Sequence, residues 1–344
     1  MNGKMHRRKE KKMTVLVTGN LPEKVLSFLR REHHVVSHAE NRPMERGRLL
    51  EMIKDKAGLL CMITDRIDDD LLRSAPYLKA IANMAVGYDN INVKTATRRG
   101  IPVSNTPGVL TDATADLAFA LILAVARRVV EGDRMTREGR FKFWAPMYFL
   151  GQEVSGKTLG IVGLGRIGRA VARRAKGFGM TVLYYSRARI SSGEEKKLEI
   201  AYCDRDSLLS RSDFVSLHVP LSPGTQHLIG KKELAMMRPS AYLINTSRGP
   251  VVDEEALVSA LKKKAIAGAG LDVYEREPAV SSGLKVLENV VLLPHMGSAT
   301  VETRTNMAFR AAENLVAALR GERPPDCLNW DALRTGAPET SQEK

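Results

Sequence analysis

The sequence predicts an α/β protein with two doubly wound parallel sheets, one in each of two Rossmann-like domains. Two series of short apolar strands alternate with helical segments, and a glycine-rich turn stands between a strand and a helix. The chain has 344 residues, of which 44% are apolar, so it can fill two hydrophobic cores. We therefore expect a first sheet near the N-terminus and a second sheet built around the glycine-rich turn.

The first series of strands lies in residues 13–108 and contains no glycine fingerprint. Helical or mixed segments separate five short apolar stretches. The strands are predicted at Val15–Thr18, Val35–Ser37, Gly58–Ile63, Ala80–Ala82 and Pro102–Ser104.

The second series is expected to run through residues 109–295 and to open with a long helix from about Val109 to Arg134. A strand at Thr158–Val162, a helix at Arg166–Gly177 and a strand at Met180–Tyr185 surround the glycine-rich turn. Further strands are predicted at Phe214–Leu217, Ala241–Asn245, Ala267–Leu271 and Val290–Leu293.

A last helix is predicted over Ala299–Arg320, with Ser298 as its N-cap and Gly321 as its stop. Because the first series is small, we expect this helix to cross back and complete it. Residues 13–108 and 296–330 then form a discontinuous substrate-binding domain, and residues 109–295 form a dinucleotide-binding domain. The two crossings near Pro107 and Pro294 predict a double hinge that flanks an interdomain active-site cleft. Residues 331–344 are expected to be a flexible tail.

The net charge of +14 raises the question of a nucleic-acid partner. About a third of this excess lies in residues 1–12, which we expect to be a disordered basic tail, and the rest is scattered without a groove-reading pattern. The longest apolar run, Leu117–Ala126, is too short to span a bilayer, and the N-terminus lacks a secretory core. Cys61, Cys203 and Cys327 are far apart, which argues against disulfides and zinc. We expect a cytoplasmic protein without nucleic-acid, membrane or metal partners.

The segment Gly-Ile-Val-Gly-Leu-Gly-Arg-Ile-Gly-Arg at 160–169 predicts a cradle for the pyrophosphate of a dinucleotide. Gly163, Gly165 and Gly168 allow a tight turn and a close approach of backbone to phosphate, and the following helix N-terminus attracts the anion. The strand before this segment and the helix and strand after it supply the βαβ unit that the motif requires.

Nineteen residues beyond Gly168 the chain has Arg187, where an NAD-binding protein usually has Asp or Glu. Ser186 can donate a hydrogen bond to a 2′-phosphate, and Arg187 and Arg189 can add charge-assisted contacts. This pattern predicts that NADPH is preferred and leaves room for NADH. The alternative interpretation is a solvated basic loop.

Three polar segments, Ile244–Gly249, Gly270–Pro278 and Leu293–Ser298, each follow an apolar strand, at the edge where open α/β sheets bind ligands. Arg248 can fork onto a carboxylate or carbonyl oxygen, and His295 stands where it can exchange a proton with a substrate. Taken singly, Arg248 has a plainer interpretation as a surface ion-pair partner, and His295 has one as a structural histidine. We assign no catalytic role to the other histidines, including His33, His34, His38, His218 and His227.

Together these segments resemble the D-isomer-specific 2-hydroxyacid dehydrogenase family, and within it the glyoxylate reductases that also accept hydroxypyruvate. The likeness runs from about Met13 to Leu328 and includes Ala85–Ile91 and Asn105–Asp116. It implies the catalytic residues Arg248, Glu277 and His295. It further implies that His295 protonates the carbonyl oxygen, that Glu277 orients the imidazolium, and that Arg248 grips the substrate together with the backbone of Val86 and Gly87.

The resemblance also implies a cofactor site drawn from the cradle, the basic turn and the segments at the reactive end, where Asp272 would orient the carboxamide. We expect this site to comprise Gly163, Gly165, Arg166, Ile167, Gly168, Ser186, Arg187, Arg189, Pro220, Thr246, Ser247, Asp272, Gly297 and Thr111. The expected reaction reduces glyoxylate to glycolate, and hydroxypyruvate to D-glycerate, with NADPH. Alternatives are a D-3-phosphoglycerate dehydrogenase, another 2-oxo-acid reductase, or a dinucleotide-sensing protein of the corepressor type.

Six large apolar residues between Phe141 and Leu150 indicate an oligomer contact, and family members of this kind are typically homodimers. The alternative is that this segment is a buried loop within one subunit.

Overall fold

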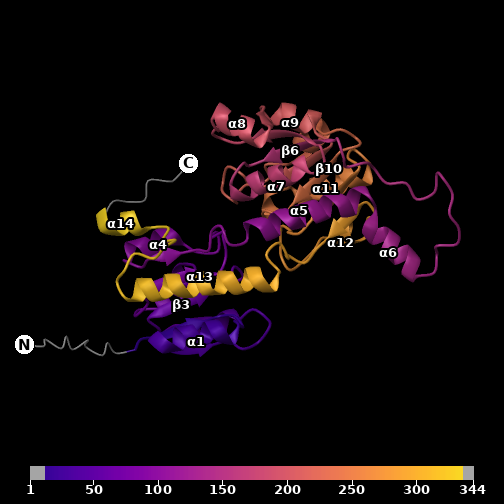
Figure 1. Cartoon of the computed structure of the whole chain (residues 1–344). Coiled ribbons are helices and arrows are strands. Elements are labelled where there is room, and N and C mark those ends of the chain that lie inside the picture. The colour runs from indigo at the N-terminus through magenta and orange to yellow at the C-terminus, as the bar shows by residue number, and fades with distance from the viewer. Residues whose placement is uncertain (1–11, 336–344) are drawn as a thin grey trace, which may run out of the picture. The chain divides into compact units, whose positions relative to one another are not determined.

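The computed structural model describes residues 12–335, which form two α/β units. Within this part of the chain, unit 1 takes residues 12–109 and 301–335, and unit 2 takes Leu110–Thr300. Each unit contains one wholly parallel sheet with helices on both faces (Figure 1). The predicted fold class, two doubly wound parallel sheets, is confirmed. The predicted basic tail at residues 1–12 lies, apart from Lys12, outside the described residues.

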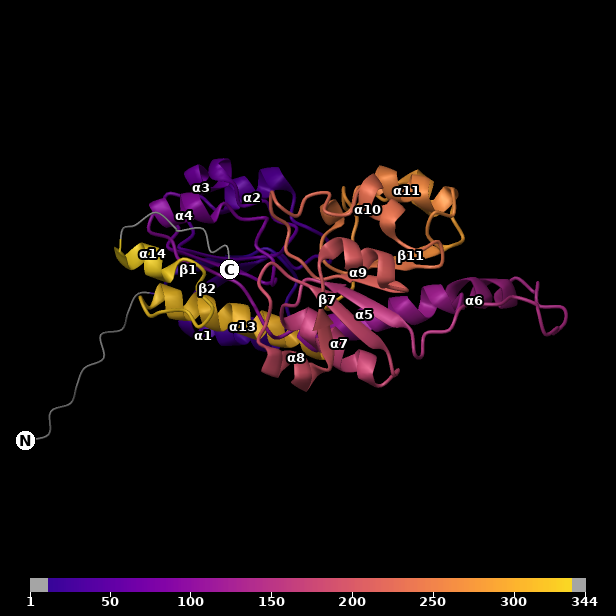
Figure 2. The ribbon, with the colours of Figure 1, turned by 90° about the horizontal axis from the view of Figure 1, so that it is seen from above.

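Unit 1 has a five-stranded sheet whose strands closely match the predicted ones. They are β1 (Thr14–Val17), β2 (His34–Ser37), β3 (Gly58–Cys61), β4 (Ala80–Asn83) and β5 (Val103–Ser104). The order is β2-β1-β3-β4-β5. The helices are α1 (Glu23–Glu32), α2 (Arg46–Met52), α3 (Asp69–Ser74), α4 (Val93–Arg98), α13 (Val301–Leu319) and α14 (Trp330–Thr335). Figure 2 shows α1 and α13 on one face of this sheet and α2, α3 and α4 on the other.

Helix α13 belongs to unit 1 and begins at Val301, two residues later than predicted. Ala308, Ala311 and Leu315 are fully buried in the core that α13 forms with α1, β1 and β3. The helix ends at Leu319, and Gly321, two residues later, has φ +75°; its N–H donates to the Ala318 carbonyl, and the Glu322 N–H donates to the Ala317 carbonyl. This left-handed stop confirms the role predicted for Gly321.

The end of the described chain differs from the flexible tail predicted for residues 331–344, because α14 covers Trp330–Thr335. Asn329 holds the start of this helix to unit 1. Its amide nitrogen donates to the Thr97 hydroxyl at 2.8 Å and to the Ile101 carbonyl at 2.9 Å, and its amide oxygen accepts from the Val103 N–H at 2.9 Å. A buried asparagine whose side chain makes these bonds fixes the chain direction just before the helix, and apolar periodicity does not reveal it.

Unit 2 has a seven-stranded sheet that includes every strand predicted for it. The strands are β6 (Thr158–Val162), β7 (Thr181–Tyr185), β8 (Ile200–Tyr202), β9 (Phe214–Leu217), β10 (Tyr242–Asn245), β11 (Gly268–Leu271) and β12 (Val290–Leu292), in the order β12-β11-β10-β9-β6-β7-β8. The short edge strand β8 is an addition to the prediction. Because the order reverses between β6 and β9, a ligand-binding crevice is expected at the carboxyl ends of these two strands.

Two apolar cores lie on opposite faces of this sheet. The helices are α5 (Thr111–Ala126), α6 (Val129–Arg137), α7 (Arg166–Lys176), α8 (Ser192–Leu198), α9 (Arg205–Arg211), α10 (Lys231–Met236), α11 (Glu254–Lys262) and α12 (Ser282–Lys285), with a 3₁₀ turn at Gly249–Val251. Helices α5 and α7 contribute to one core, and α9, α10 and α11 contribute to the other. None of the helices within residues 12–335 has the length and apolar character needed to cross a bilayer.

The long helix predicted from Val109 to Arg134 is wrong as a single element, because the chain breaks between α5 and α6. Arg128 has a left-handed backbone with φ +55°. Its guanidinium binds both carboxylate oxygens of Glu131, donates to the Leu150 carbonyl at 3.2 Å and lies 3.9 Å from the centre of the Phe149 ring. These contacts outweigh the local helix propensity. After the break, α6 and the loop that follows it extend away from the sheet of unit 2 (Figures 1 and 2).

Candidate active site

The cradle after β6 has the backbone geometry that a dinucleotide requires. Gly163 has φ +96°, and a Cβ atom there would lie 2.6 Å from the His218 carbonyl oxygen. A Cβ atom on Gly168 would lie 2.2 Å from the Gly163 carbonyl oxygen, whereas one on Gly165 would meet nothing within 4 Å. Gly163 and Gly168 therefore permit the turn and the close packing of α7 on it, and the space at Gly165 remains open at the helix N-terminus. This arrangement fits a pyrophosphate.

Of the two arginines in the basic turn after β7, Arg189 is paired with a glutamate and Arg187 has no such partner in the described part of the chain. Arg189 donates to both carboxylate oxygens of Glu195, at 2.8 and 2.7 Å, and the Tyr184 hydroxyl donates to the same carboxylate at 2.7 Å. The bonds from Arg189 and Tyr184 lower the pKa of Glu195 to about 2. Arg187 is exposed, and its side chain has no hydrogen bond or ion pair within residues 12–335. Arg187, more than Arg189, is therefore available for a phosphate.

His295 and Glu277 form a hydrogen-bonded pair in unit 2. His295 Nδ1 lies 2.7 Å from Glu277 Oε2, and the Tyr274 N–H donates to Glu277 Oε1 at 3.0 Å. Burial by itself would raise the pKa of Glu277, but the bond to His295 and the neighbouring positive charge outweigh burial and lower that pKa. The side chains are 38% and 32% exposed, so the pair is fixed on one side and accessible on the other. Such an arrangement leaves the second ring nitrogen free to exchange a proton with a ligand.

The backbone at His295 is held in an unusual conformation by Asp272. His295 has φ +52°, a left-handed value that residues other than glycine adopt at an energetic cost. The carboxylate of Asp272, only 1% exposed, accepts from the Met296 N–H at 2.7 Å and from the Gly297 N–H at 2.8 Å. Burial raises the pKa of Asp272 although these backbone bonds favour its charged form. Asp272 thus fixes the segment that carries His295, and its predicted contact with a cofactor stays a prediction.

Arg248 lies on a turn that Asn245 organises. The buried Asn245 amide donates to the Arg248 carbonyl at 2.9 Å, and its oxygen accepts from the Ser247 N–H and hydroxyl at 3.0 and 2.8 Å. A Cβ atom on Gly249 would lie 1.8 Å from the Tyr274 carbonyl oxygen, so the backbones of the two segments are in contact. The segments that carry Arg248 and Glu277 therefore lie side by side in unit 2. The sequence reasoning had assigned no part to Asn245 or Gly249, and a polar residue at the end of the buried strand β10 was the available signal.

The remaining predicted site residues lie at several places. Thr246 follows β10 and has a buried hydroxyl that lacks a hydrogen-bond partner among the described residues, which fits a polar ligand there. Gly297 is buried, and its carbonyl accepts from the Thr114 hydroxyl at 3.2 Å. Thr111 begins α5, Pro220 follows β9, and Val86 and Gly87 follow β4 in unit 1. Contacts of these residues with a cofactor or substrate stay predictions.

Two other histidines of unit 2 also have polar partners. The His218 ring lies 2.8 Å from the Ser216 hydroxyl, and burial lowers the pKa of His218 to about 4, which agrees with a structural role. His227 Nε2 lies 2.6 Å from Glu275 Oε1, so a His–Glu pair is not by itself a mark of catalysis. Among the described residues, no group of three or more His, Cys, Asp or Glu side chains is arranged to hold a metal ion.

Comparison with known proteins gives close similarity over nearly the whole chain. The model of the "D-isomer specific 2-hydroxyacid dehydrogenase, NAD binding domain" matches residues 119–297. A glyoxylate reductase of Thermococcus litoralis is 53% identical over 331 residues, which are 95% of this chain and 100% of the relative. A crystal structure of a protein from Thermus thermophilus is 46% identical, with a TM-score of 0.87 and coverage of 92% of this chain and 100% of that one.

A further similar structure contains a cofactor. It is an NADPH-dependent glyoxylate/hydroxypyruvate reductase of Sinorhizobium meliloti, solved in complex with NADP and malonate. It is 33% identical, with a TM-score of 0.81, and the match covers 92% of this chain and 97% of that one.

Proposed function

The chain belongs to the D-isomer specific 2-hydroxyacid dehydrogenase family and is a nicotinamide-dependent oxidoreductase, and from this premise we propose that it reduces glyoxylate to glycolate, preferably with NADPH. The observation that carries the proposal is the accessible His295–Glu277 pair, held beside the Arg248 turn in the unit that contains the dinucleotide cradle. The 53% identity to a glyoxylate reductase supports the choice of substrate. Hydroxypyruvate, whose reduction gives D-glycerate, is proposed as a second substrate.

The protein's own residues provide the groups that reduction of a 2-oxo acid needs. When bound, the reduced nicotinamide supplies the hydride. As negative charge develops on the carbonyl oxygen, His295 in its protonated form donates the proton from Nε2, and Glu277 stabilises the imidazolium through Nδ1. Arg248 polarises the substrate carbonyl and binds the substrate carboxylate. We assign the N–H groups of Val86 and Gly87 to the same carboxylate. The cofactor phosphates are assigned to the cradle and its helix N-terminus.

Purified protein incubated with glyoxylate is expected to oxidise NADPH, with loss of the nicotinamide absorbance. The same assay with hydroxypyruvate, 3-phosphohydroxypyruvate and pyruvate, and with NADH in place of NADPH, ranks substrates and cofactors by kcat/KM. A protein that reduces 3-phosphohydroxypyruvate best would instead be a phosphoglycerate dehydrogenase. A protein that binds the cofactor but reduces none of these acids would favour the dinucleotide-sensing alternative.

Replacing Arg187 by Asp is expected to reverse the cofactor preference. One charge-assisted contact with a 2′-phosphate contributes roughly 1.5–3 kcal/mol, so the dissociation constant of NADPH should rise about ten- to a hundredfold. The new carboxylate can accept from both ribose hydroxyls of NADH. Fluorescence titration with each cofactor measures the change. Arg189→Gln is the matched comparison: because Arg189 is already bound to Glu195, it should affect NADPH binding less, and equal losses in the two variants would contradict this assignment.

The apolar arm at residues 141–150 supports a homodimer. Trp144 and Met147 are 78% and 81% exposed, and Phe141, Phe143 and Leu150 are each more than half exposed. The alternative that this segment is buried within one subunit is therefore wrong. Such a concentration of exposed large apolar side chains marks an interaction surface. Arg128 holds the last two residues of the arm, through the Phe149 ring and the Leu150 carbonyl.

The double replacement of Trp144 and Met147 by Ser is expected to convert a dimer into a monomer. Light scattering during gel filtration should give the mass of two chains of 37.9 kDa for the wild type and the mass of one such chain for the variant. Tyr77→Ser is the control, because Tyr77 is 67% exposed in unit 1 but lies outside the arm. A wild-type monomer, or a variant that stays dimeric, would argue against this interface.

A further inference from the structure

The loop after β4 in unit 1 has its successive carbonyl groups bound by the protein. The Thr106 N–H donates to the Ala85 carbonyl at 2.8 Å, the Asn105 amide to the Val86 carbonyl at 2.7 Å, and the Asn83 amide to the Gly87 carbonyl at 2.9 Å. Within residues 12–335, neither the Val86 N–H nor the Gly87 N–H has an acceptor. The loop therefore commits its carbonyl oxygens and leaves two adjacent donors available.

Peptide planarity connects these two facts. In a trans peptide the carbonyl and the N–H of the same unit point in opposite directions. The Val86 carbonyl and the Gly87 N–H belong to one peptide, which is trans. The bond from the Asn105 amide to the Val86 carbonyl therefore directs the Gly87 N–H away from Asn105. For the preceding peptide the same task is performed by a backbone group, that of Thr106, so Asn105 is the side chain on which the orientation of the Gly87 N–H depends.

This restraint is needed because the peptide adjoins a glycine. Gly87 has no Cβ atom and tolerates a wide range of φ and ψ, so the Val86–Gly87 peptide can rotate at little cost unless something holds it. A rotated peptide would present the Val86 carbonyl oxygen, with its negative partial charge, where the N–H had been. An anion would then meet repulsion in place of a hydrogen bond.

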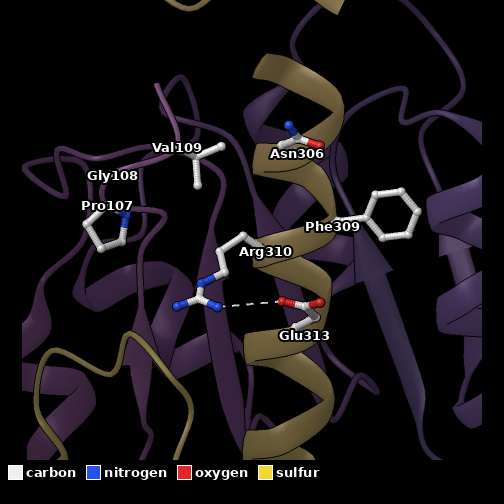
Figure 3. A pocket seen from close by; sticks show the side chains of 7 residues that line it. All are labelled: Pro107, Gly108, Val109, Asn306, Phe309, Arg310 and Glu313. Carbon is white, nitrogen blue, oxygen red and sulfur yellow. Dashed lines mark ion pairs between the residues drawn. The ribbon is translucent and has the colours of Figure 1, made fainter. Parts of the chain in front are cut away.

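Asn105 is itself held firmly. It is only 6% exposed. The Asn314 side-chain amide of α13 donates to the main-chain carbonyl of Asn105 at 3.1 Å, and the main-chain N–H of Asn105 donates to the Asp326 carbonyl at 3.4 Å. Arg310 of α13 binds the Asp326 carboxylate. Figure 3 shows Arg310 and Glu313 of α13 joined by an ion pair, at a pocket of about 490 Å³ that residues 107–109 and α13 line. The donor that restrains the Val86 carbonyl is therefore anchored to the long helix of unit 1.

We propose that Asn105 is a positioning residue, which aims the N–H of Gly87 at the carboxylate of the 2-oxo acid. The inference rests on the proposed function, since it takes the loop of Val86 and Gly87 to bind that carboxylate. Asn83 restrains the next peptide through the Gly87 carbonyl and supports the same orientation. Asn105 does not touch the substrate in this scheme and acts only through the peptide.

Asn105→Asp tests the proposal with a pH-dependent readout. An ionised aspartate has nearly the same shape but no donor, and it repels the Val86 carbonyl, whereas a protonated aspartate can donate to it. The probe is oxamate, a non-reducible 2-oxo-acid analogue, titrated calorimetrically into the NADPH-loaded protein. At pH 8 the dissociation constant is expected to be about ten- to a hundredfold higher than in the wild type. Because the position is buried and faces a carbonyl oxygen, the pKa of the introduced carboxyl should lie well above its ordinary value, and the ratio of the two dissociation constants should fall towards one as the pH is lowered to 5. The KM for glyoxylate should follow, and NADPH affinity should be unchanged.

Two further variants separate positioning from general stability. Asn105→Ala should weaken oxamate binding at every pH, without recovery in acid. Asn329→Ala also removes buried hydrogen bonds from unit 1 but leaves this loop alone, so it should lower Tm without weakening oxamate binding. Unchanged oxamate binding in both Asn105 variants, or a loss in Asn105→Asp that does not recover at low pH, would overturn the inference while wild-type activity left the proposed function intact. A wild type that neither bound oxamate nor reduced glyoxylate would overturn both.

Discussion

Replacing His295 by Asn is expected to lower kcat about a hundred- to ten-thousandfold while NADPH binding is retained, because the variant loses the proton donor but not the cradle. Asn is chosen because it tolerates the left-handed backbone at this position better than other residues do. Its amide can also donate to Glu277. Single-turnover reduction of glyoxylate, followed by nicotinamide absorbance, measures the chemical step, and fluorescence titration measures the dissociation constant of NADPH.

The matched control for His295 is His227→Asn. His227 also has a left-handed backbone and also lies within hydrogen-bond distance of a glutamate, Glu275. Its exposure of 41% is close to that of His295. If catalysis depends on the position of the imidazole at the end of β12, only the His295 variant should lose turnover. Equal losses in both variants, or full activity in His295→Asn, would refute the assignment of the proton donor.

Replacing Gly249 by Ala is expected to lower kcat/KM for glyoxylate about a hundredfold, since a displacement near 1 Å in a catalytic group can cost that much. The added Cβ atom would lie 1.8 Å from the Tyr274 carbonyl oxygen and 2.5 Å from the Glu275 nitrogen. Both are backbone atoms, so relief requires that the segments of Arg248 and Glu277 move apart. Overpacking of this kind also destabilises a fold by roughly 1–3 kcal/mol, which should appear as a lower Tm.

Gly224→Ala is the control for this steric argument. A Cβ atom at Gly224, in the same unit, would meet nothing within 4 Å, so the variant should keep both its Tm and its activity. The decisive comparison is kcat/KM in Gly249→Ala at a temperature well below its Tm. Wild-type activity there would mean that contact between the two segments does not set the position of Arg248.

The fold and the segments of the site were predictable because their signals are local. The strand Thr158–Val162 matches β6 residue for residue, since apolar character and the glycine turn both limit it. Gly321 was recognisable as a helix stop, because glycine readily adopts the left-handed backbone found there. The segments of Arg248, Glu277 and His295 each follow a strand of one parallel sheet, which is why topology alone brings them to one edge.

The features that sequence reasoning missed depend on partners distant in the chain or on side-chain direction. The break at Arg128 is stabilised by Phe149 and Leu150, so helix periodicity predicted a continuous helix. The pair between Arg189 and Glu195 was not predicted, because it depends on how α8 lies against β7; a contact of Arg189 with the 2′-phosphate stays a prediction. The resemblance assigned Asp272 to the carboxamide, but its bonds to the Met296 and Gly297 N–H groups, which hold the backbone beside His295, have no signal in the local sequence.

The bidentate pair between Arg189 and Glu195 has a consequence for redesign. Because the Arg189 guanidinium is already paired with Glu195 of α8, the assignment proposed above makes discrimination between NADPH and NADH depend mainly on Arg187, an exposed residue. On that assignment, a single substitution at Arg187 would redirect the enzyme towards NADH and would leave the Arg189–Glu195 pair in place. By the same reasoning, one mutation at this position would let a homologue evolve from NADPH to NADH.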